Sequence, residues 1–338
     1  MYPSIYGKFL ILGLWCLRQK DNSLNIYDKY NLRDREILSL FYKGVDKMKI
    51  GIDIGGSHIA IGVVNSDGKI VEKIEKSWTN DEKQDIKKSI EEYIKENYKI
   101  LDKKYNIEKV GMSIPGNSKD GVILNSGNLG VRDYNIVGNL QKEILVPITI
   151  RNDAKCAAIA ENTYGCLKEY SNSIFLTLGT GIGGAAFADD QLLKGGKKIG
   201  YEFGHMIIEK NGIPCICGKK GCFERYASMK VFKINLRNIL GLDEKTRGEE
   251  LVTIIRNNKP DSKDYEKIET VIEQYIENLS LGIINLIEIF EPEIIGLGGS
   301  FVHFEDILLE RLKKNVNRDV IIQTAVLGND AGIIGATL

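Results

Sequence analysis

The sequence has no excess of either charge, since its 46 lysines and arginines are balanced by 46 aspartates and glutamates. A protein whose main ligand is a nucleic acid or an anionic membrane normally needs a basic face. The only long apolar run near the N-terminus, residues 9–17, is too short to span a bilayer and is followed by no small-residue cleavage site. The sequence therefore favours a small-molecule ligand and a cytoplasmic protein, with no nucleic-acid or membrane partner.

Cysteine is also scarce, with six in 338 residues. Cys16, Cys156 and Cys166 follow no spacing pattern, and each is most simply a small apolar residue or a free thiol. These cysteines give no basis for a disulfide framework of the kind that small secreted domains use.

The other three cysteines lie close to one histidine in the chain. His205, Cys215, Cys217 and Cys222 follow one another at spacings of ten, two and five. Three thiolates and one imidazole complete a tetrahedral zinc site, and four filled positions leave none open for activating a water. The alternative is three unrelated buried cysteines and a surface histidine, yet all four fall within 18 residues. The spacing predicts a structural zinc that holds neighbours such as Glu224.

Apolar runs and turns alternate from residue 49 onward, which predicts a mixed α/β fold. The chain is long enough for two domains, and neither an internal repeat nor a low-complexity linker is visible. Strands are expected at 50–53, 59–64, 69–74, 110–114, 147–150, 173–179 and 293–299, the first three forming hairpins, and helices at 82–105, 154–161 and 268–290.

Three glycine-bearing turns each follow an expected strand, at 53–58, 179–184 and 296–300. Glycine lets backbone amides approach a phosphate closely. Each turn alone is more often a plain turn, but the three together indicate phosphate binding. None is a P-loop with its lysine, and none has the full context of a dinucleotide fingerprint. The phosphates are therefore expected to lie between two opposing hairpins.

These motifs occur in an order that resembles the ROK family of repressors and sugar kinases. The matching segments are DIGGSH at 53–58, SIPG at 113–116, Asn128-Leu129, RNDA at 151–154, LTLGTGIGGA at 176–185, the zinc block and GLGGS at 296–300. The resemblance implies the actin-like ATPase, or ribonuclease-H-like, fold with two α/β domains around a cleft. It places a small domain at 48–156 plus about 325–338, and a large domain with the zinc loop at 157–324.

The resemblance also implies a role for each motif residue. Asp153 is the expected catalytic base, and Asp53 the acidic residue near Mg²⁺ and the phosphates of ATP. The expected phosphate and nucleoside contacts are Gly55, Gly56, Ser57, Gly179, Thr180, Gly181, Gly183, Gly298 and Gly299. The expected sugar contacts are Asn128, Asn152, Asp153, Glu202, His205 and Glu224.

The position of Asp153 supports two interpretations. An aspartate between a strand and a helix lies at the positive end of the helix dipole, which favours the carboxylate at neutral pH. On position alone, however, the same residue could equally cap the helix. His58 and His303, the other two histidines, are expected to be structural or surface groups.

The motif set predicts an ATP-dependent hexose kinase, most simply one that converts glucose to glucose 6-phosphate with Mg²⁺ and a structural zinc. Alternatives are a kinase for N-acetylmannosamine or another hexose, and a sugar-sensing repressor. The stretch after Leu129 lacks the tryptophan common in sugar kinases of this family, so the sugar is less defined than the reaction. The family is often dimeric or tetrameric, which predicts a homo-oligomer.

Residues 1–47 precede the matching region and carry eight basic and five acidic side chains. Their one convincing helix, at about 32–42, is too little for a winged helix-turn-helix, which needs two helices and a wing. Because the strand pattern begins abruptly after Met48, we hypothesise that Met48 is the true start. Mass spectrometry of the native protein would contradict this by finding peptides from 24–43.

Overall fold

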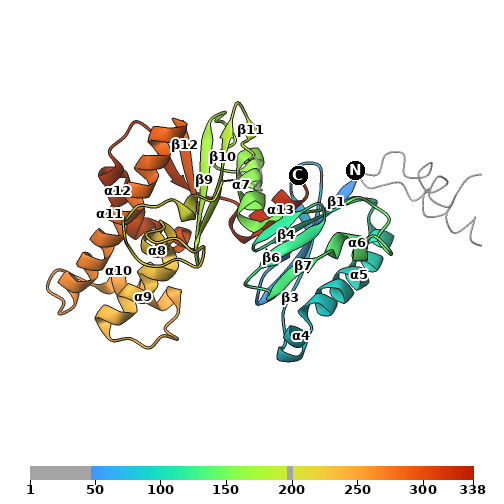
Figure 1. Cartoon of the computed structure of the whole chain (residues 1–338), viewed down its shortest axis with the longest axis horizontal. Coiled ribbons are helices and arrows are strands. Elements are labelled where there is room, and N and C mark those ends of the chain that lie inside the picture. The colour runs from blue at the N-terminus through green and yellow to red at the C-terminus, as the bar shows by residue number, and fades with distance from the viewer. Residues whose placement is uncertain (1–46, 196–200) are drawn as a thin grey trace, which may run out of the picture. The chain divides into compact units, whose positions relative to one another are not determined.

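The computed structural model describes residues 47–195 and 201–338, all within the unit Lys47–Leu338 (Figure 1). The helix expected at 32–42 and the rest of the N-terminal extension lie outside the described residues. Within them, the expected mixed α/β fold is confirmed. None of the described helices is long and apolar enough to cross a membrane.

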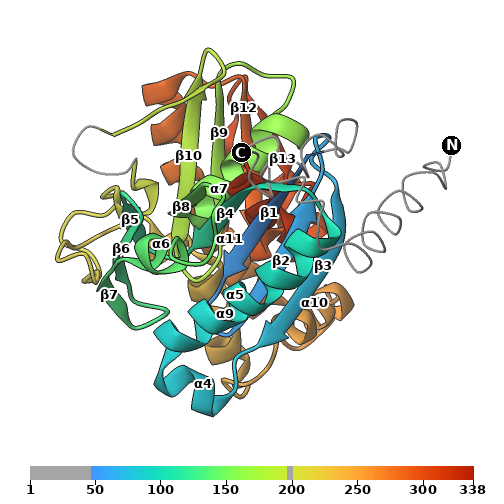
Figure 2. The same cartoon turned by 90° about the vertical axis from the view of Figure 1, so that its right-hand side faces the viewer.

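The first sheet contains the two hairpins that the sequence predicted. Its strands are β1 (Met48–Ile54), β2 (His58–Val64), β3 (Ile70–Ser77), β4 (Ile107–Ile114) and β8 (Ile148–Asn152). They lie in the order β3-β2-β1-β4-β8, and Figure 2 shows the first four side by side. The pairs β3–β2 and β2–β1 are antiparallel, whereas β1–β4 and β4–β8 are parallel. The carboxyl ends of β1, β4 and β8 therefore meet at one edge.

The second sheet repeats this arrangement. Its strands are β9 (Ser173–Leu178), β10 (Ile182–Ala188), β11 (Gln191–Leu192), β12 (Ile294–Gly299) and β13 (Ile321–Thr324). They lie in the order β11-β10-β9-β12-β13, again with two antiparallel pairs followed by two parallel pairs. The sequence shows no internal repeat, because two unrelated sets of apolar strands can form sheets with the same strand order. A small third sheet, which the sequence analysis missed, comprises β5 (Asn117–Lys119), β6 (Val122–Ser126) and β7 (Val131–Tyr134).

Each large sheet has its own apolar core. Isoleucines of β1 and β2 pack with the buried face of α5 (Ile86–Lys104), and Phe232, Leu279 and Leu308 lie in the core of the second sheet. The helices are α4 (Asn80–Gln84), α5 (Ile86–Lys104), α6 (Ile136–Leu140), α7 (Asp153–Tyr164), α8 (Glu224–Ala227), α9 (Met229–Leu240), α10 (Gly248–Asn257), α11 (Tyr265–Phe290), α12 (Glu305–Val316) and α13 (Ala331–Ala336), with 3-10 turns η1 (Phe203–His205), η2 (Ser300–Phe304) and η3 (Gly328–Asp330). The domain boundaries given above stay a prediction.

The single helix predicted over 82–105 is wrong at its N-terminal end, because the structure has two helices there. Asp85 ends α4 and begins α5, and its carboxylate accepts a hydrogen bond from the Lys88 amide at 3.3 Å. A capping aspartate supplies an acceptor to an otherwise unpaired helical N–H, so α5 begins anew at residue 86.

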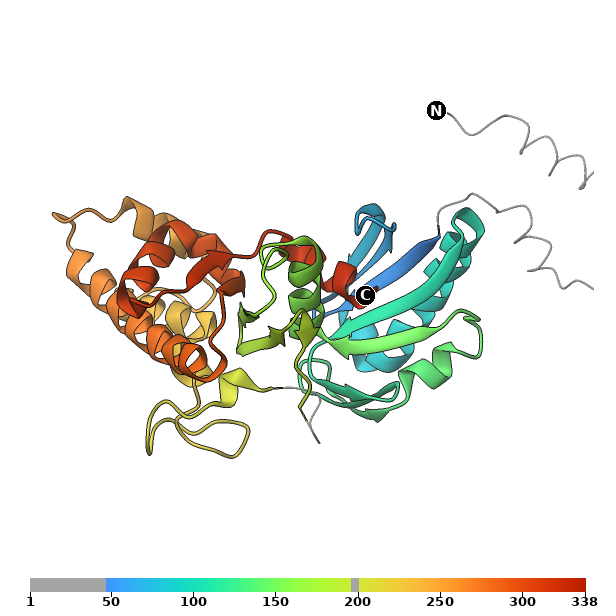
Figure 3. The same cartoon turned by 90° about the horizontal axis from the view of Figure 1, so that it is seen from above.

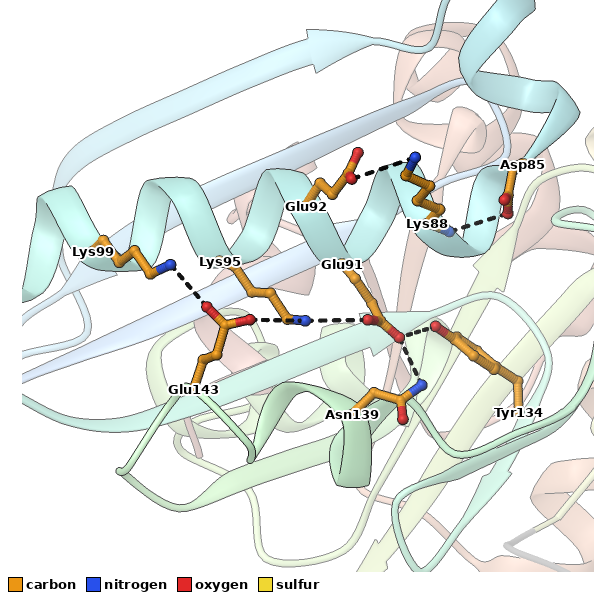
Figure 4. Close-up of polar contacts among 9 residues, drawn as sticks. All are labelled: Asp85, Lys88, Glu91, Glu92, Lys95, Lys99, Tyr134, Asn139 and Glu143. Atoms are coloured by element: carbon orange, nitrogen blue, oxygen red, sulfur yellow. Dashed lines mark hydrogen bonds and ion pairs between the residues drawn. The ribbon is translucent and has the colours of Figure 1, made fainter.

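The polar face of α5 is tied to β7 and α6 by a hydrogen-bond network (Figure 4). Glu91 accepts hydrogen bonds from the Tyr134 hydroxyl and, at 2.7 Å, from the Asn139 amide. Lys95 lies between Glu91 at 3.3 Å and Glu143 at 3.2 Å. The network fixes the helix against the segment that leads into β8, the strand ending at the candidate site.

The C-terminal helix α13 packs on β1 and β4 and against α7. The approach is close because each contact has a glycine. A Cβ added at Gly111 of β4 would overlap the Ala336 carbonyl oxygen of α13, and a Cβ added at Gly335 of α13 would overlap the Cys156 carbonyl oxygen of α7. Helix α13 therefore joins the first sheet to the helix that begins with Asp153.

Gly111→Ala is expected to lower the free energy of unfolding by about 1–3 kcal/mol, the usual cost of overpacking. The obstacle is a backbone oxygen, which cannot move away by changing rotamer. Gly127→Ala is the matched control, because no atom outside its chain neighbours lies within 4 Å of a Cβ there. Urea denaturation compares the two variants with the parent. Equal stability of all three proteins would show that α13 does not pack as described.

Glu161 is a fully buried carboxylate in α7 that binds three backbone amides. One oxygen accepts from Val326 at 3.0 Å and Leu327 at 2.8 Å, and the other accepts from Cys166 at 2.9 Å. The three bonds join α7 to the turn after it and to the segment that leads from β13 to α13. Glu161 thus holds together the two chain segments that connect the sheets.

Glu161→Gln is expected to destabilise the protein by about 3 kcal/mol, since a hydrogen bond to a charged group contributes roughly 1.5–3 kcal/mol. The amide would also turn an N–H group toward at least one backbone donor. Glu169→Gln, at an exposed position nearby, is the control and is expected to change nothing. Urea midpoints at neutral pH measure both, and a parent-like Glu161→Gln midpoint would contradict the role assigned to this carboxylate.

Candidate active site

Two aspartates predicted from the motifs line one cavity of about 360 Å³. Asp53 lies near the end of β1 and Asp153 at the start of α7, so the sheet edge brings together residues 100 positions apart. Gly298 and Gly299, at the end of β12, line the same cavity. His58 and His303 are exposed, as expected of surface groups, and both also line this cavity.

Asp153 is not the residue that caps α7. Asn152 is the N-cap, and its side-chain oxygen accepts from the Lys155 amide at 3.2 Å. One Asp153 oxygen, Oδ1, accepts from the Ala154 amide at 2.8 Å and from the Asn152 side chain at 2.9 Å. Among the residues that the structure describes, none donates to Oδ2. One carboxylate oxygen is thus held in place, and the other is left for a substrate proton.

Burial, as the largest cause, and the negative charge of Asp53 together raise the pKa of Asp153 to about 6. The hydrogen bonds from Ala154 and Asn152 lower it without outweighing burial. The dipole argument from the sequence predicted a shift of the pKa in the opposite direction. A carboxylate with a pKa of about 6 is still ionised at neutral pH, and it is a stronger base than a free aspartate.

Asp53 is a second, partly buried carboxylate, and the Ser113 hydroxyl donates to its Oδ1 at 2.6 Å. Burial raises its pKa, while Ser113, His58 and Lys73 oppose the rise. Gly332 of α13 lies so close that an added Cβ would be 2.9 Å from the Asp53 carboxyl carbon. A partly buried carboxylate without an ion pair in the described chain suits Mg²⁺, which commonly binds one or two carboxylates together with substrate phosphates.

The two expected phosphate turns are the tips of hairpins. In the first, between β1 and β2, the Gly55 amide donates to the His58 carbonyl at 2.8 Å, and the Trp78 indole donates to the Gly55 carbonyl at 3.1 Å. Ser57, in the same turn, has its hydroxyl 3.3 Å from Nδ1 of His58.

In the second turn, between β9 and β10, the Gly179 amide donates to the Gly181 carbonyl at 3.0 Å. A Cβ at Gly183 would lie only 2.7 Å from the Ala154 Cβ. Because this glycine has no side chain, the second turn can lie against the start of α7, next to Asp153.

A second cavity, of about 460 Å³, contains part of the expected sugar set. Asn128 and Glu224 line it together with Thr180 and Gly181 of the second turn. A Cβ at Gly181 would lie 2.6 Å from a Glu224 carboxylate oxygen. Two of the expected sugar residues and the second expected phosphate turn therefore line the same cavity.

Two other expected sugar residues, like His205, line neither of the two cavities. Asn152 donates from its side-chain nitrogen to the Gly116 carbonyl at 3.0 Å and to Asp153, so its amide protons are already bound. Glu202 is exposed, lines neither cavity and interacts electrostatically with Lys155. The direct sugar contacts predicted for these two residues stay predictions, and Asn152 is better suited to positioning Asp153.

The four residues of the predicted zinc site are brought together. The ligand atoms of His205, Cys215, Cys217 and Cys222 all lie within 4.8 Å of one another. Cys215 and Cys222 are buried, whereas Cys217 is exposed. The ligands lie on η1 and on the loop that follows it, drawn in yellow in Figure 3. Three sulfurs and one ring nitrogen at this separation fit a tetrahedral zinc.

Glu224 contacts this cluster directly. Its Oε1 lies 3.3 Å from the Cys215 sulfur and 3.6 Å from Nδ1 of His205. The His205 ring turns Nδ1 toward the thiols, since this atom is 3.7 Å from the Cys215 sulfur. A metal in the cluster would thus fix the carboxylate that lines the sugar cavity, as the sequence predicted.

Sequence reasoning missed three positively charged residues at the site. Lys73 of β3 lines the first cavity, where it pairs with Asp330 at 3.0 Å. Arg225 and Lys230 line the second cavity. Arg225 had a signal in the sequence, because it directly follows Glu224 in the zinc block, whereas nothing near Lys73 marked it.

The ROK family matches residues 49–338 of this chain. A glucokinase from Halalkalibacterium halodurans is 30% identical over 319 residues, which cover 86% of this chain and 94% of the relative. A xylose repressor from Bacillus subtilis is 25% identical over 309 residues, which cover 90% of this chain and 76% of the relative. The crystal structure of a ROK family glucokinase from Streptomyces griseus, in complex with glucose and AMPPNP, has a TM-score of 0.71 and 24% identity, and covers 86% of this chain and 98% of that one. The similarity confirms the expected actin-like ATPase fold.

Proposed function

Because the chain belongs to the ROK family, we propose that it is an ATP-dependent hexose kinase, with glucose as its simplest substrate and glucose 6-phosphate as the product. The observation that carries the proposal is Asp153, a partly buried carboxylate with one oxygen held and one free, in a cavity shared with Asp53. The glucokinase relative supports the same reaction.

In the proposed reaction, the sugar hydroxyl oxygen forms a bond to the γ-phosphorus of ATP. The bond from that phosphorus to the bridging oxygen breaks, and its electron pair stays with ADP. Asp153 takes the hydroxyl proton through its free oxygen, while Ala154 and Asn152 hold the other oxygen. Because the transition state of phosphoryl transfer is loose, the base orients the hydroxyl first and accepts the proton late.

The glycine turns and Asp53 would hold the nucleotide. The amides of Gly55–Ser57 and Gly179–Gly181 can donate to phosphate oxygens, and Gly298 and Gly299 would lie near the nucleoside. Asp53 would hold Mg²⁺ with the phosphates. When bound, Mg²⁺ supplies positive charge that neutralises the phosphate oxygens.

Asn128, Glu224 and Nε2 of His205 would bind the sugar, and Asn152 would position Asp153. The Cys₃His cluster would hold a structural zinc, whose effect is to fix Glu224 and the His205 ring. By its family we also propose a cytoplasmic homo-oligomer, a dimer or a tetramer, that binds no nucleic acid.

The test measures ADP release from magnesium ATP by the metal-replete protein, with glucose, mannose, fructose, N-acetylglucosamine and N-acetylmannosamine in turn. We expect turnover with at least one of these sugars, and the preferred sugar decides between a glucokinase and an N-acetylmannosamine kinase. Silence across the panel would refute the proposal. The sugar-sensing role of the repressor relative would then be tested by DNA binding at fixed salt.

A further inference from the structure

The second cavity carries two positive charges that nothing in the described chain neutralises. Arg225 is the second residue of α8, and Lys230 the second residue of α9. Neither side chain has a hydrogen bond or ion pair with the residues described here, and the Arg225 Nε is buried without a partner. A buried N–H group without an acceptor costs free energy, which an anionic ligand would offset.

The charges of the two cavities differ in sign. Among the described residues, Glu224 is the one acidic residue that lines the second cavity, and its Oε1 faces the cluster of His205, Cys215, Cys217 and Cys222. The first cavity is lined by four carboxylates, and its one lysine, Lys73, is already paired with Asp330 and Glu75. Among the described residues that line the two cavities, the arginine and lysine side chains without an ion pair are therefore those of the second cavity.

The two cations lie beside the second phosphate turn. Thr180 and Gly181 line the same cavity, and the Lys230 backbone amide donates to the Gly179 carbonyl at 3.0 Å. Asn128 and Glu224, the candidate sugar contacts, complete the lining. A phosphoryl group passing from the turn to the sugar would enter this space. A guanidinium suits it, because its planar N–H groups match phosphate oxygens in pairs.

We propose that Arg225, together with Lys230, binds the phosphoryl group that this enzyme transfers. The inference rests on the proposed kinase function and adds a catalytic residue to it. The bound group is either the γ-phosphate of ATP or the phosphate of the sugar phosphate product, and both offer the same oxygens. In either case the guanidinium balances negative charge on the phosphoryl oxygens, and Asp153 still takes the proton.

The first experiment measures turnover of Arg225→Met, which removes the charge and keeps the side-chain length. We expect kcat to fall about 10²-fold, as when one donor to a developing oxyanion is removed, with a KM for the sugar that stays close to the parent value. Arg225→Lys should recover part of the loss, and Lys230→Met should have a smaller effect. Arg318→Met removes an exposed arginine that pairs with Glu288 at 3.3 Å, and it should leave turnover unchanged. Because Arg225 has no partner in the described chain, Arg225→Met should also keep the parent Tm.

The second experiment measures binding by calorimetry, with magnesium AMPPNP and with glucose 6-phosphate as probes. Weaker binding of AMPPNP alone by Arg225→Met would identify the γ-phosphate as the bound group, and weaker binding of glucose 6-phosphate alone would identify the product. Parent-like kcat and parent-like binding of both probes would overturn the inference. If the parent phosphorylates no sugar but Arg225→Met still weakens AMPPNP binding, the proposed reaction fails and the phosphate site stands.

Discussion

Asp153→Asn is expected to lower kcat by about 10²–10⁴-fold, the range that general base catalysis contributes. The free carboxylate oxygen of Asp153 would accept the sugar proton, and an amide cannot do so. The asparagine oxygen can still accept the hydrogen bond from the Ala154 amide, so the local geometry should survive. Sugar binding, measured by calorimetry, is therefore expected to stay close to the parent value while turnover is lost.

The stability of the same variant separates catalysis from misfolding. The pKa of Asp153 in the folded protein, about 6, lies above the ordinary 3.8 of aspartate. Ionising this group therefore costs folding free energy, a cost that sets in as the pH rises past 3.8 and is complete above about 6. Asparagine avoids the cost, so Asp153→Asn should be at least as stable as the parent at pH 7. Asp67→Asn, at an exposed turn, is the matched control. Full turnover by Asp153→Asn would exclude this residue as the base.

The same pKa predicts the acid limb of the pH profile. The base works when it is deprotonated, so kcat/KM should be constant above a pH of about 6 and fall about tenfold per unit below it. An aspartate with an ordinary pKa would keep its activity to well below pH 5. Initial rates between pH 5 and 8, at saturating magnesium, measure the limb. A flat profile down to pH 5 would show that Asp153 is not the titrating base.

Features that depend on neighbouring residues were predictable from the sequence. The hairpins of β1, β2 and β3 follow from alternating apolar runs around the turn at 65–68. The placement of Asp53 and Asp153 follows because both aspartates come at the ends of strands that meet at one edge of a sheet. The convergence of His205 with the three cysteines was predictable because their spacing is local in the chain, and their ligand atoms lie together.

Features that depend on burial or on distant partners were not predictable. The pKa of Asp153 is set mainly by desolvation, which no residue pattern reports. The amide side chain of Asn152 is chemically suited to bind a sugar, yet its N–H groups donate to Asp153 and to the Gly116 carbonyl, which is 36 residues away in the chain. Arg225 has a weak signal in the sequence, next to Glu224, but its buried Nε without a partner among the described residues is visible only in the folded chain. The small sheet of β5, β6 and β7 has strands too short for a periodic signal.

Removal of the metal is expected to weaken sugar binding and to lower the Tm together. The cluster joins η1 to the loop before α8. Oε1 of Glu224 lies 3.3 Å from the Cys215 sulfur and 3.6 Å from Nδ1 of His205. Without a cation, three thiols and an imidazole lie within 4.8 Å of one another with no bond that fixes their relative positions. Groups fixed by a metal shell commonly lose 10–100-fold in function when that shell is disrupted. The KM for the sugar should therefore rise about tenfold or more.

Cys217→Ser is the sharper version of this experiment, because Cys217 is the exposed member of the cluster and its loss removes a ligand with little loss of packing. The parent should contain one zinc per chain by elemental analysis, and the variant much less. Chelator treatment of the parent, followed by dialysis and return of magnesium, should reproduce the variant, and added zinc should restore only the parent. If Cys217→Ser and the chelated parent keep the parent KM and Tm, the cluster does not hold Glu224. A fall in Tm with an unchanged KM would show that the metal stabilises its own loop and does not position Glu224. Only displacement of the Glu224 carboxylate from the second cavity would change the KM as well as the Tm.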